Sequence, residues 1–259
     1  MSPAPTSPAP TSPVLELSKL THAYGEHPVL NGVELAIGAG EFVALIGPNG
    51  SGKTTLLKCL AGILAPQGGS VRIAGTDMAA DPLAAKAALG FAVDPVLLPP
   101  LLTGRQCLEL FAGVRGLPVL PESSLALARS LAFDTWLDRE VQSYSLGTRQ
   151  KLGILLGLVG EPPLLVLDEP MNGLDPQSAF ALKKHLVGLT RERGTAVLLA
   201  THALEVAERF ITRATLLIEG RLVREWDTAT LDAIRHDPDS SLEQVMVEAL
   251  AEHGAARET

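Results

Sequence analysis

The sequence predicts an α/β fold in which a mostly parallel sheet forms the core, with an antiparallel β subdomain and an inserted helical subdomain. Three observations predict it. Residues 42–46 form an uninterrupted apolar run, typical of a strand buried on both faces of a parallel sheet. A glycine-rich loop and a helix with one apolar face follow this run directly. Residues 101–160 have few β-branched runs and show short helical patterns instead.

The loop between this strand and helix carries the pattern G-x-x-x-x-G-K-[ST] on Gly47, Gly52, Lys53 and Thr54. Glycines leave room for backbone N–H groups to point at phosphate oxygens, and the helix N-terminus adds partial positive charge. Lys53 is placed to reach the β- and γ-phosphates, and the Thr54 hydroxyl to bind Mg²⁺. The pattern therefore predicts a nucleoside triphosphate site on a P-loop NTPase core.

Composition excludes several other classes of function. The chain has 21 Lys and Arg against 29 Asp and Glu, a net charge of −8, which argues against a broad nucleic-acid surface. Cys59 and Cys107 are the only cysteines in the sequence, so neither a disulfide framework nor a metal cluster is indicated, and a reducing cytosol fits. No apolar run reaches the roughly 18 residues that cross a bilayer, and no signal peptide is expected.

The N-terminal part divides into a tail and a strand region. Residues 1–13 repeat SPAPT and are expected to form a disordered tail without an assigned function. Residues 14–37 alternate and predict antiparallel strands with turns at Gly25 and at Asn31-Gly32. Tyr24 precedes the phosphate loop; it either stacks on a purine or packs as an ordinary strand residue.

The stretch GILAPQGGSVRIAG, residues 62–75, predicts a turn and a strand, and LGFAVD, residues 89–94, predicts a strand that ends at Asp94. The helical subdomain at about 101–160 closes with YSLGTRQKLGILLGLV, in which a small-residue turn opens a helix. Ser145 and Gly147 in that turn either present backbone N–H groups to an anion or act simply as an N-cap and a turn glycine.

The core resumes with the apolar strand LLVLD, which ends in two carboxylates. Asp168 is placed to hold Mg²⁺ through water, and Glu169 to orient or deprotonate an attacking water. A helix over 179–194 and a strand over 195–202 follow, with His202 at the edge where parallel sheets place ligands. A hairpin turning at Glu219 and Gly220, a polar stretch and an amphipathic helix over 241–253 complete the chain; this helix packs on the core or contacts a partner.

These motifs together resemble the nucleotide-binding subunit of ABC transporters over residues 14–228, with 229–259 as a C-terminal helical extension. Tyr24 corresponds to the adenine-stacking aromatic residue, Ser145 and Gly147 to the signature motif, and Leu174 and Asp175 to the D-loop. Asp168 and Glu169 correspond to Walker B and its catalytic glutamate, and His202 to the switch histidine. The Walker A loop corresponds to Gly47, Pro48, Asn49, Gly50, Ser51, Gly52, Lys53, Thr54 and Thr55.

The resemblance implies an ATPase that uses ATP and Mg²⁺, with Lys53, Glu169 and His202 as catalytic residues. It implies a head-to-tail homodimer in which the signature turn of one copy closes over the ATP of the other. It also implies a permease on a separate chain, at the cytoplasmic face of the cell membrane, and no nucleic acid. The alternatives are a soluble ABC-type ATPase acting on nucleic acid or ribosomes, and an assembly protein that binds ATP without turnover, against which Glu169 argues.

The chain also departs from the family pattern. Asp94 replaces the Q-loop glutamine and is a further candidate Mg²⁺ ligand. Leu146 and Thr148 replace a glycine and a glutamine of the signature, and Met171 replaces a small hydroxyl residue. The YSLGTRQKL signature, the acidic Q-loop and the late helix resemble the branch that serves drug, polysaccharide or antibiotic exporters.

Overall fold

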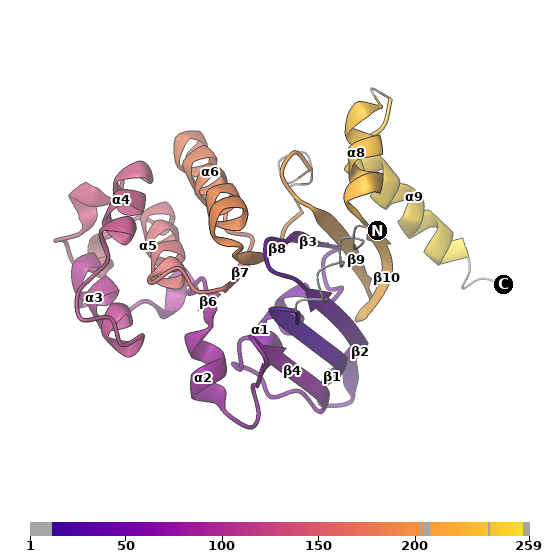
Figure 1. The fold of residues 1–259 in the computed structure, drawn as a ribbon, viewed down its shortest axis with the longest axis horizontal. Coiled ribbons are helices and arrows are strands. Elements are labelled where there is room, and N and C mark those ends of the chain that lie inside the picture. The colour runs from indigo at the N-terminus through magenta and orange to yellow at the C-terminus, as the bar shows by residue number, and fades with distance from the viewer. Residues whose placement is uncertain (1–11, 203, 205–207, 238, 256–259) are drawn as a thin grey trace, which may run out of the picture.

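The structure, a computed structural model, describes residues 12–202, 204, 208–237 and 239–255. The predicted disordered tail, residues 1–13, lies almost entirely outside this range. Two sheets and the helices around them make up the described part (Figure 1). The helical group α3 to α5 lies at one end of the molecule, and α8 and α9 lie at the other.

The larger sheet has six strands in the order β10-β9-β3-β8-β7-β6. β9 pairs with β10 in antiparallel fashion, and the other neighbours pair in parallel. This arrangement confirms the predicted mostly parallel core. Its strands are β3 (Phe42–Ile46), β6 (Leu89–Phe91), β7 (Leu164–Asp168), β8 (Ala196–Ala200), β9 (Arg213–Ile218) and β10 (Arg221–Trp226).

Strand β3 is buried along its whole length because both faces of the sheet are covered. Phe42, Ala44 and Ile46 face a core shared with the helices of both ends. Val43 and Leu45 face a second core, which includes α1 (Lys53–Leu60) and the antiparallel sheet. The strand that leads into the phosphate loop is therefore held rigidly from both sides.

The smaller sheet is antiparallel, with the order β2-β1-β4-β5. Its strands are β1 (Leu15–Tyr24), β2 (His27–Ile37), β4 (Gly68–Ile73) and β5 (Thr76–Asp77). The turn at Gly25 is confirmed, but the turn predicted at Asn31-Gly32 is wrong, because β2 continues through both residues. The backbone N–H and side-chain amide of Asn31 donate to the carbonyls of Gly220 and Glu219, at 2.9 and 2.8 Å, so long-range bonds hold this dipeptide in the strand.

Helices fill the segment between β6 and β7. They are α3 (Gly104–Val114), α4 (Glu122–Ser130) and α5 (Leu146–Leu158), with short 3₁₀ turns at Pro95–Leu97, Asp134–Trp136 and Val141–Ser143. Thr103 and Gln106 form a capping box at the start of α3, which fixes where that helix begins. No strand of either sheet lies between residues 101 and 160, as the helical patterns predict.

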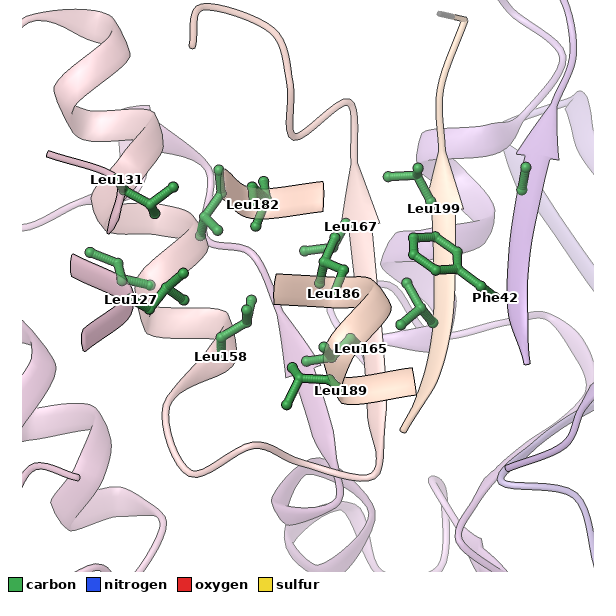
Figure 2. Close-up of a cluster of buried hydrophobic side chains, with 14 of the residues drawn as sticks. Phe42, Leu127, Leu131, Leu158, Leu165, Leu167, Leu182, Leu186, Leu189 and Leu199 are labelled. Atoms are coloured by element: carbon green, nitrogen blue, oxygen red, sulfur yellow. The ribbon is translucent and has the colours of Figure 1, made fainter. Parts of the chain in front are cut away.

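Helix α6 (Pro176–Arg193) joins this group to the sheet. Leu182, Leu186 and Leu189 form a stripe on one face of α6 and are buried (Figure 2). They lie between Leu165 and Leu167 of β7 on one side and leucines of the α4 and α5 region on the other. The helical group and the sheet therefore share one continuous apolar core.

Three local predictions need correction. Strand β6 ends at Phe91 rather than at Asp94, because Asp94 is the N-cap of the following 3₁₀ turn. A short helix, α2 (Pro82–Ala87), lies in a region for which no helix is predicted. The polar stretch after β10 contains α8 (Thr228–His236), capped by Asp227.

Helix α9 (Leu242–Ala255) confirms the predicted amphipathic helix. Its residues Leu242 and Ala249 are buried in the core shared with the sheet, so the helix packs on the core. Across the part of the chain that the structure describes, every helix is too short or too polar to span a bilayer.

Candidate functional site

The phosphate loop has a shape that requires glycine at two positions. Gly47 and Gly52 have φ angles of 154° and 106°, in the region that favours glycine. A Cβ on Gly47 would lie 2.2 Å from the carbonyl oxygen of Leu217, and one on Gly52 would lie 2.9 Å from that of Val29. The loop is therefore pressed against β9 and β2, which holds its backbone in the curled form that the motif predicts.

The β9–β10 turn is hydrogen-bonded to the phosphate loop. The Gly220 N–H donates to the Ser51 carbonyl at 3.0 Å, and Gly220 in turn accepts from the Asn31 N–H. Ser51 is buried, and its hydroxyl has no hydrogen-bond partner among the described residues. Ser51 therefore serves the loop through its backbone.

Lys53 opens α1 and lies within the loop. Its ammonium donates to the carbonyls of Gly47 and Pro48 at 2.7 and 3.1 Å. Burial lowers the pKa of Lys53, while the nearby Glu169 and Asp168 carboxylates oppose that shift. A positive charge that is only partly solvated interacts more strongly with an anion than one in bulk water.

Thr54 and Asp168 meet across the gap between α1 and the end of β7. The Thr54 hydroxyl donates to Asp168 Oδ2 at 2.7 Å, so two oxygen ligands lie side by side at the mouth of the loop. Mg²⁺ in nucleotide sites takes one or two carboxylates together with phosphate oxygens and water, and this pair fits that requirement. The described residues contain no group of three or more His, Cys, Asp or Glu side chains that could hold a metal ion.

Glu169 follows β7 in an unusual backbone conformation. Its φ angle of 46° is left-handed, and its N–H donates to the Ala200 carbonyl at 2.9 Å, which extends the β7–β8 ladder by one residue. His202 Nδ1 lies 2.7 Å from Glu169 Oε1. Because an ionised carboxylate only accepts hydrogen bonds, Nδ1 carries the proton in this pair and donates it. The strained backbone and the histidine together fix the direction of the carboxylate.

The phosphate loop and the carboxylates at the end of β7 surround a cavity of about 450 Å³, and His202 is not among its lining residues. Tyr24 stands at its rim, about half exposed, with its ring edge-on to the buried His22 at 5.0 Å. The predicted residues that line the cavity are Tyr24, Asn49, Gly50, Gly52, Lys53, Thr54, Thr55, Asp168 and Glu169. Val29 of β2 also lines the cavity. The sequence does not predict this, because the position of Val29 depends on how the two sheets pack against each other.

Asp94 lies outside this cavity, in an adjacent hollow of about 350 Å³ that Thr54, Asp168 and Glu169 also border. Its Oδ1 accepts the Val96 N–H at 2.9 Å, so one carboxylate oxygen caps the 3₁₀ turn. Gln150 and Asn172 line the same hollow and carry no sequence signal of their own. The metal role predicted for Asp94 stays a prediction.

Ser145 and Gly147 also lie outside the cavity. Ser145 is exposed and caps α5, with its Oγ accepting the Thr148 N–H at 3.1 Å. Gly147 packs against the turn before α6, where an added Cβ would lie 2.5 Å from the Gly173 carbonyl oxygen. The structure therefore places the signature turn against the 171–175 turn of the same chain and away from the nucleotide cavity.

An ion pair strengthens this contact between α5 and the 171–175 turn. Lys151 Nζ lies 2.8 Å from Asp175 Oδ2, and Asp175 also accepts hydrogen bonds from the backbone and hydroxyl of Ser178. The Lys151 hydrogen bond, followed by those from Ser178, holds the pKa of Asp175 well below its ordinary value. Asp175 is thus both the N-cap of α6 and a link to α5.

The glycine-rich loop between β3 and α1, facing the acidic end of β7, is the arrangement of a P-loop protein that hydrolyses a nucleoside triphosphate. Comparison with known proteins makes this specific. A model of the ABC transporter family matches residues 30–172, more than half of the chain, and the chain belongs to that family. It is an ATPase of the kind found in the ATP-binding subunits of these transporters.

Several relatives are similar over most of this chain. ATP-binding cassette sub-family A member 7 of Rattus norvegicus is 37% identical over 80% of this chain, which spans 10% of that protein. The Nod factor export ATP-binding protein I of Paraburkholderia xenovorans is 34% identical over 85% of this chain and 72% of its own length. The bacitracin transport ATP-binding protein BcrA of Enterococcus faecalis is 34% identical over 84% of this chain and 70% of its own length.

Solved structures agree with this fold. An ATP-binding subunit of an ABC transporter has a TM-score of 0.81 and 31% identity, covering 92% of this chain and 99% of that one. A dimeric post-hydrolysis ATP-binding cassette bound to ADP and Pi has a TM-score of 0.74 and 27% identity, covering 83% and 98%. The second structure is a relative that holds hydrolysis products as a dimer.

Proposed function

We propose that this chain is the ATP-hydrolysing subunit of an exporter whose membrane permease is a separate chain. In this proposal two copies close head to tail on two ATP molecules, and hydrolysis releases them. One observation carries the proposal. The nucleotide cavity is lined by the loop, Tyr24 and the β7 carboxylates, while the exposed turn of Ser145 and Gly147 lies outside it. In the proposed dimer, a second copy places its own Ser145 and Gly147 turn over the nucleotide cavity of the first copy.

Each side chain then has a distinct role in hydrolysis. Lys53 neutralises charge on the β- and γ-phosphates, and Thr54 and Asp168 would hold Mg²⁺, which would polarise the phosphate oxygens when bound. Glu169 accepts the proton of the water that attacks the γ-phosphate. His202, through its 2.7 Å contact with Glu169, keeps that carboxylate aimed at the water.

The proposal of export rests on the relatives. Two of them are described as serving Nod factor export and bacitracin transport, and the signature of this chain departs from the common pattern at Leu146 and Thr148. We place the chain at the cytoplasmic face of the membrane, bound to its permease. Recovery of one integral membrane protein with the tagged chain from membranes, and its dependence on this chain for transport, would test this part.

The head-to-tail site is tested by light scattering of the Glu169→Gln protein with and without Mg-ATP. We expect ATP to convert monomer to dimer, and Ser145→Arg to abolish the conversion by placing a long cation at the interface. Ser130→Arg is the matched control, because Ser130 is also exposed but lies at the end of α4. A Ser145→Arg protein that dimerises as well as the control would contradict the proposed arrangement.

A further inference from the structure

The hydroxyl of Thr148 forms a hydrogen bond with the hydroxyl of Ser145. The two oxygens, Thr148 Oγ1 and Ser145 Oγ, lie 2.8 Å apart, and the Thr148 N–H also donates to Ser145 Oγ at 3.1 Å. Thr148 stands where the family usually has a glutamine, so this pair of contacts belongs to the departure of this chain from the signature pattern.

Either hydroxyl can donate the hydrogen bond between them. The choice of donor decides which hydroxyl proton is left without an acceptor in the protein. Each hydroxyl has one proton to donate and two lone pairs. If Ser145 donated, the Thr148 proton would need another acceptor, and the described residues offer Thr148 Oγ1 no other hydrogen-bond partner. Thr148 is buried, with 9% of its surface exposed, so leaving its proton unpaired is costly.

If Thr148 donates instead, both of its hydrogen-bond donors are satisfied. Ser145 Oγ then accepts two bonds from Thr148, one from its N–H and one from its O–H, and both of its lone pairs are occupied. The proton of Ser145 has only the exposed side left, where water or a ligand can accept it. Ser145 is thereby set as a donor, which is what an anionic phosphate requires.

We propose that Thr148 is a positioning residue that fixes Ser145 as a hydrogen-bond donor toward the triphosphate held by the partner copy. This assignment rests on the head-to-tail site proposed above. Thr148 itself is too buried to touch the nucleotide, and it acts through the direction of the Ser145 proton.

The variant that tests this is Thr148→Val, which keeps the shape of the side chain and removes the hydroxyl. The Thr148–Ser145 hydrogen bond lies within one chain, so its loss affects the dimer only by weakening the hydrogen bond from Ser145 to the phosphate, which we expect to cost about two- to twelvefold in binding per site. Because the closed dimer contains two such sites, we expect the ATP-dependent dimerisation constant of Glu169→Gln protein to fall by roughly 5- to 150-fold. Sedimentation over a range of protein concentrations measures this constant.

Three matched proteins separate positioning from general damage. Thr148→Ser retains the hydroxyl and should restore most of the dimerisation. Thr190→Val removes another buried threonine hydroxyl, which donates to the Leu186 carbonyl within α6, and should leave dimerisation unchanged. In a Ser145→Ala background, Thr148→Val should have no further effect, because the group that it positions is gone.

Two results would overturn the assignment while leaving the proposed function intact: unchanged dimerisation of Thr148→Val, or an equal loss in the Ser145→Ala background. The second would mean that Thr148 only stabilises α5. If the Glu169→Gln protein itself stayed monomeric with ATP while Thr148 was unaltered, the head-to-tail site would fail, and the assignment would fail with it.

Discussion

The contact between Gly147 and the 171–175 turn gives a quantitative prediction for Gly147→Ala. The added Cβ would lie 2.5 Å from the Gly173 carbonyl oxygen, whereas ordinary contact begins at 3.4 Å. The carbonyl would have to retreat by about 0.9 Å, and overpacking of this kind costs roughly 1–3 kcal/mol. For a chain of this size we expect the melting temperature to fall by about 2–12 °C.

The same displacement should reach Glu169, the proposed catalytic base, because the 171–175 turn begins two residues after it. A shift of about 1 Å near a reacting group can cost up to roughly 100-fold in rate, so ATPase kcat should fall well beyond the loss of folded protein. Steady-state ATPase assays and thermal melts of the same preparations measure the two effects.

Gly188→Ala is the matched control for this prediction. An added Cβ at Gly188, within α6, meets nothing within 4 Å. Alanine should therefore stabilise that helix by about 0.5–1 kcal/mol and leave ATPase activity unchanged.

The stability loss in Gly147→Ala must appear without ATP, because the contact lies within one chain. A Gly147→Ala protein that melts like the wild type would refute the packing argument.

Three further predictions follow from other parts of the structure. Lys53→Ala should weaken ATP binding with little change in melting temperature if the Lys53 charge binds the phosphates as proposed, and calorimetric titration measures the affinity. The lowered pKa of Asp175 means that its stabilising contribution is complete above the ordinary value near 3.8 and is lost as the pH falls through the folded value. Lys151→Met should therefore move the acid unfolding midpoint, followed by circular dichroism, to higher pH. Leu186→Ala should lower the free energy of unfolding in urea by about 2–5 kcal/mol, because Leu186 of α6 is fully buried between β7 and the leucines of the α4 and α5 region.

The sequence predicts those parts of the site that are contiguous or lie at strand ends. The phosphate loop is a single stretch, so its glycines, Lys53 and Thr54 can be recognised without a structure. The meeting of Thr54 with Asp168 follows from the rule that parallel strands present their carboxyl ends at one edge of the sheet. The link between Glu169 and His202 follows from the same rule, because β7 and β8 are neighbours.

The parts that the sequence missed depend on long-range contacts or on weak local signals. Asn31-Gly32 has the composition of a turn, but bonds to the β9–β10 turn hold it in β2. The sequence did contain a signal for helix α8. Asp227 is its N-cap residue, whose side chain accepts the Thr230 N–H, and the apolar residues Leu231 and Ile234 are three residues apart. Polar neighbours obscured that pattern.

The β9–β10 turn also affects how this protein can be labelled. Hairpin tips are usually safe places to insert a tag or a fluorescent domain, because few contacts depend on them. Here Gly220 bonds to Ser51 and Asn31, so an insertion at the tip would pull on the backbone of the phosphate loop. The loop between α3 and α4 is the better choice, since Val119 is 73% exposed there. A fluorescent reporter inserted in that loop would report on movements of the α3–α5 helices without altering the nucleotide site.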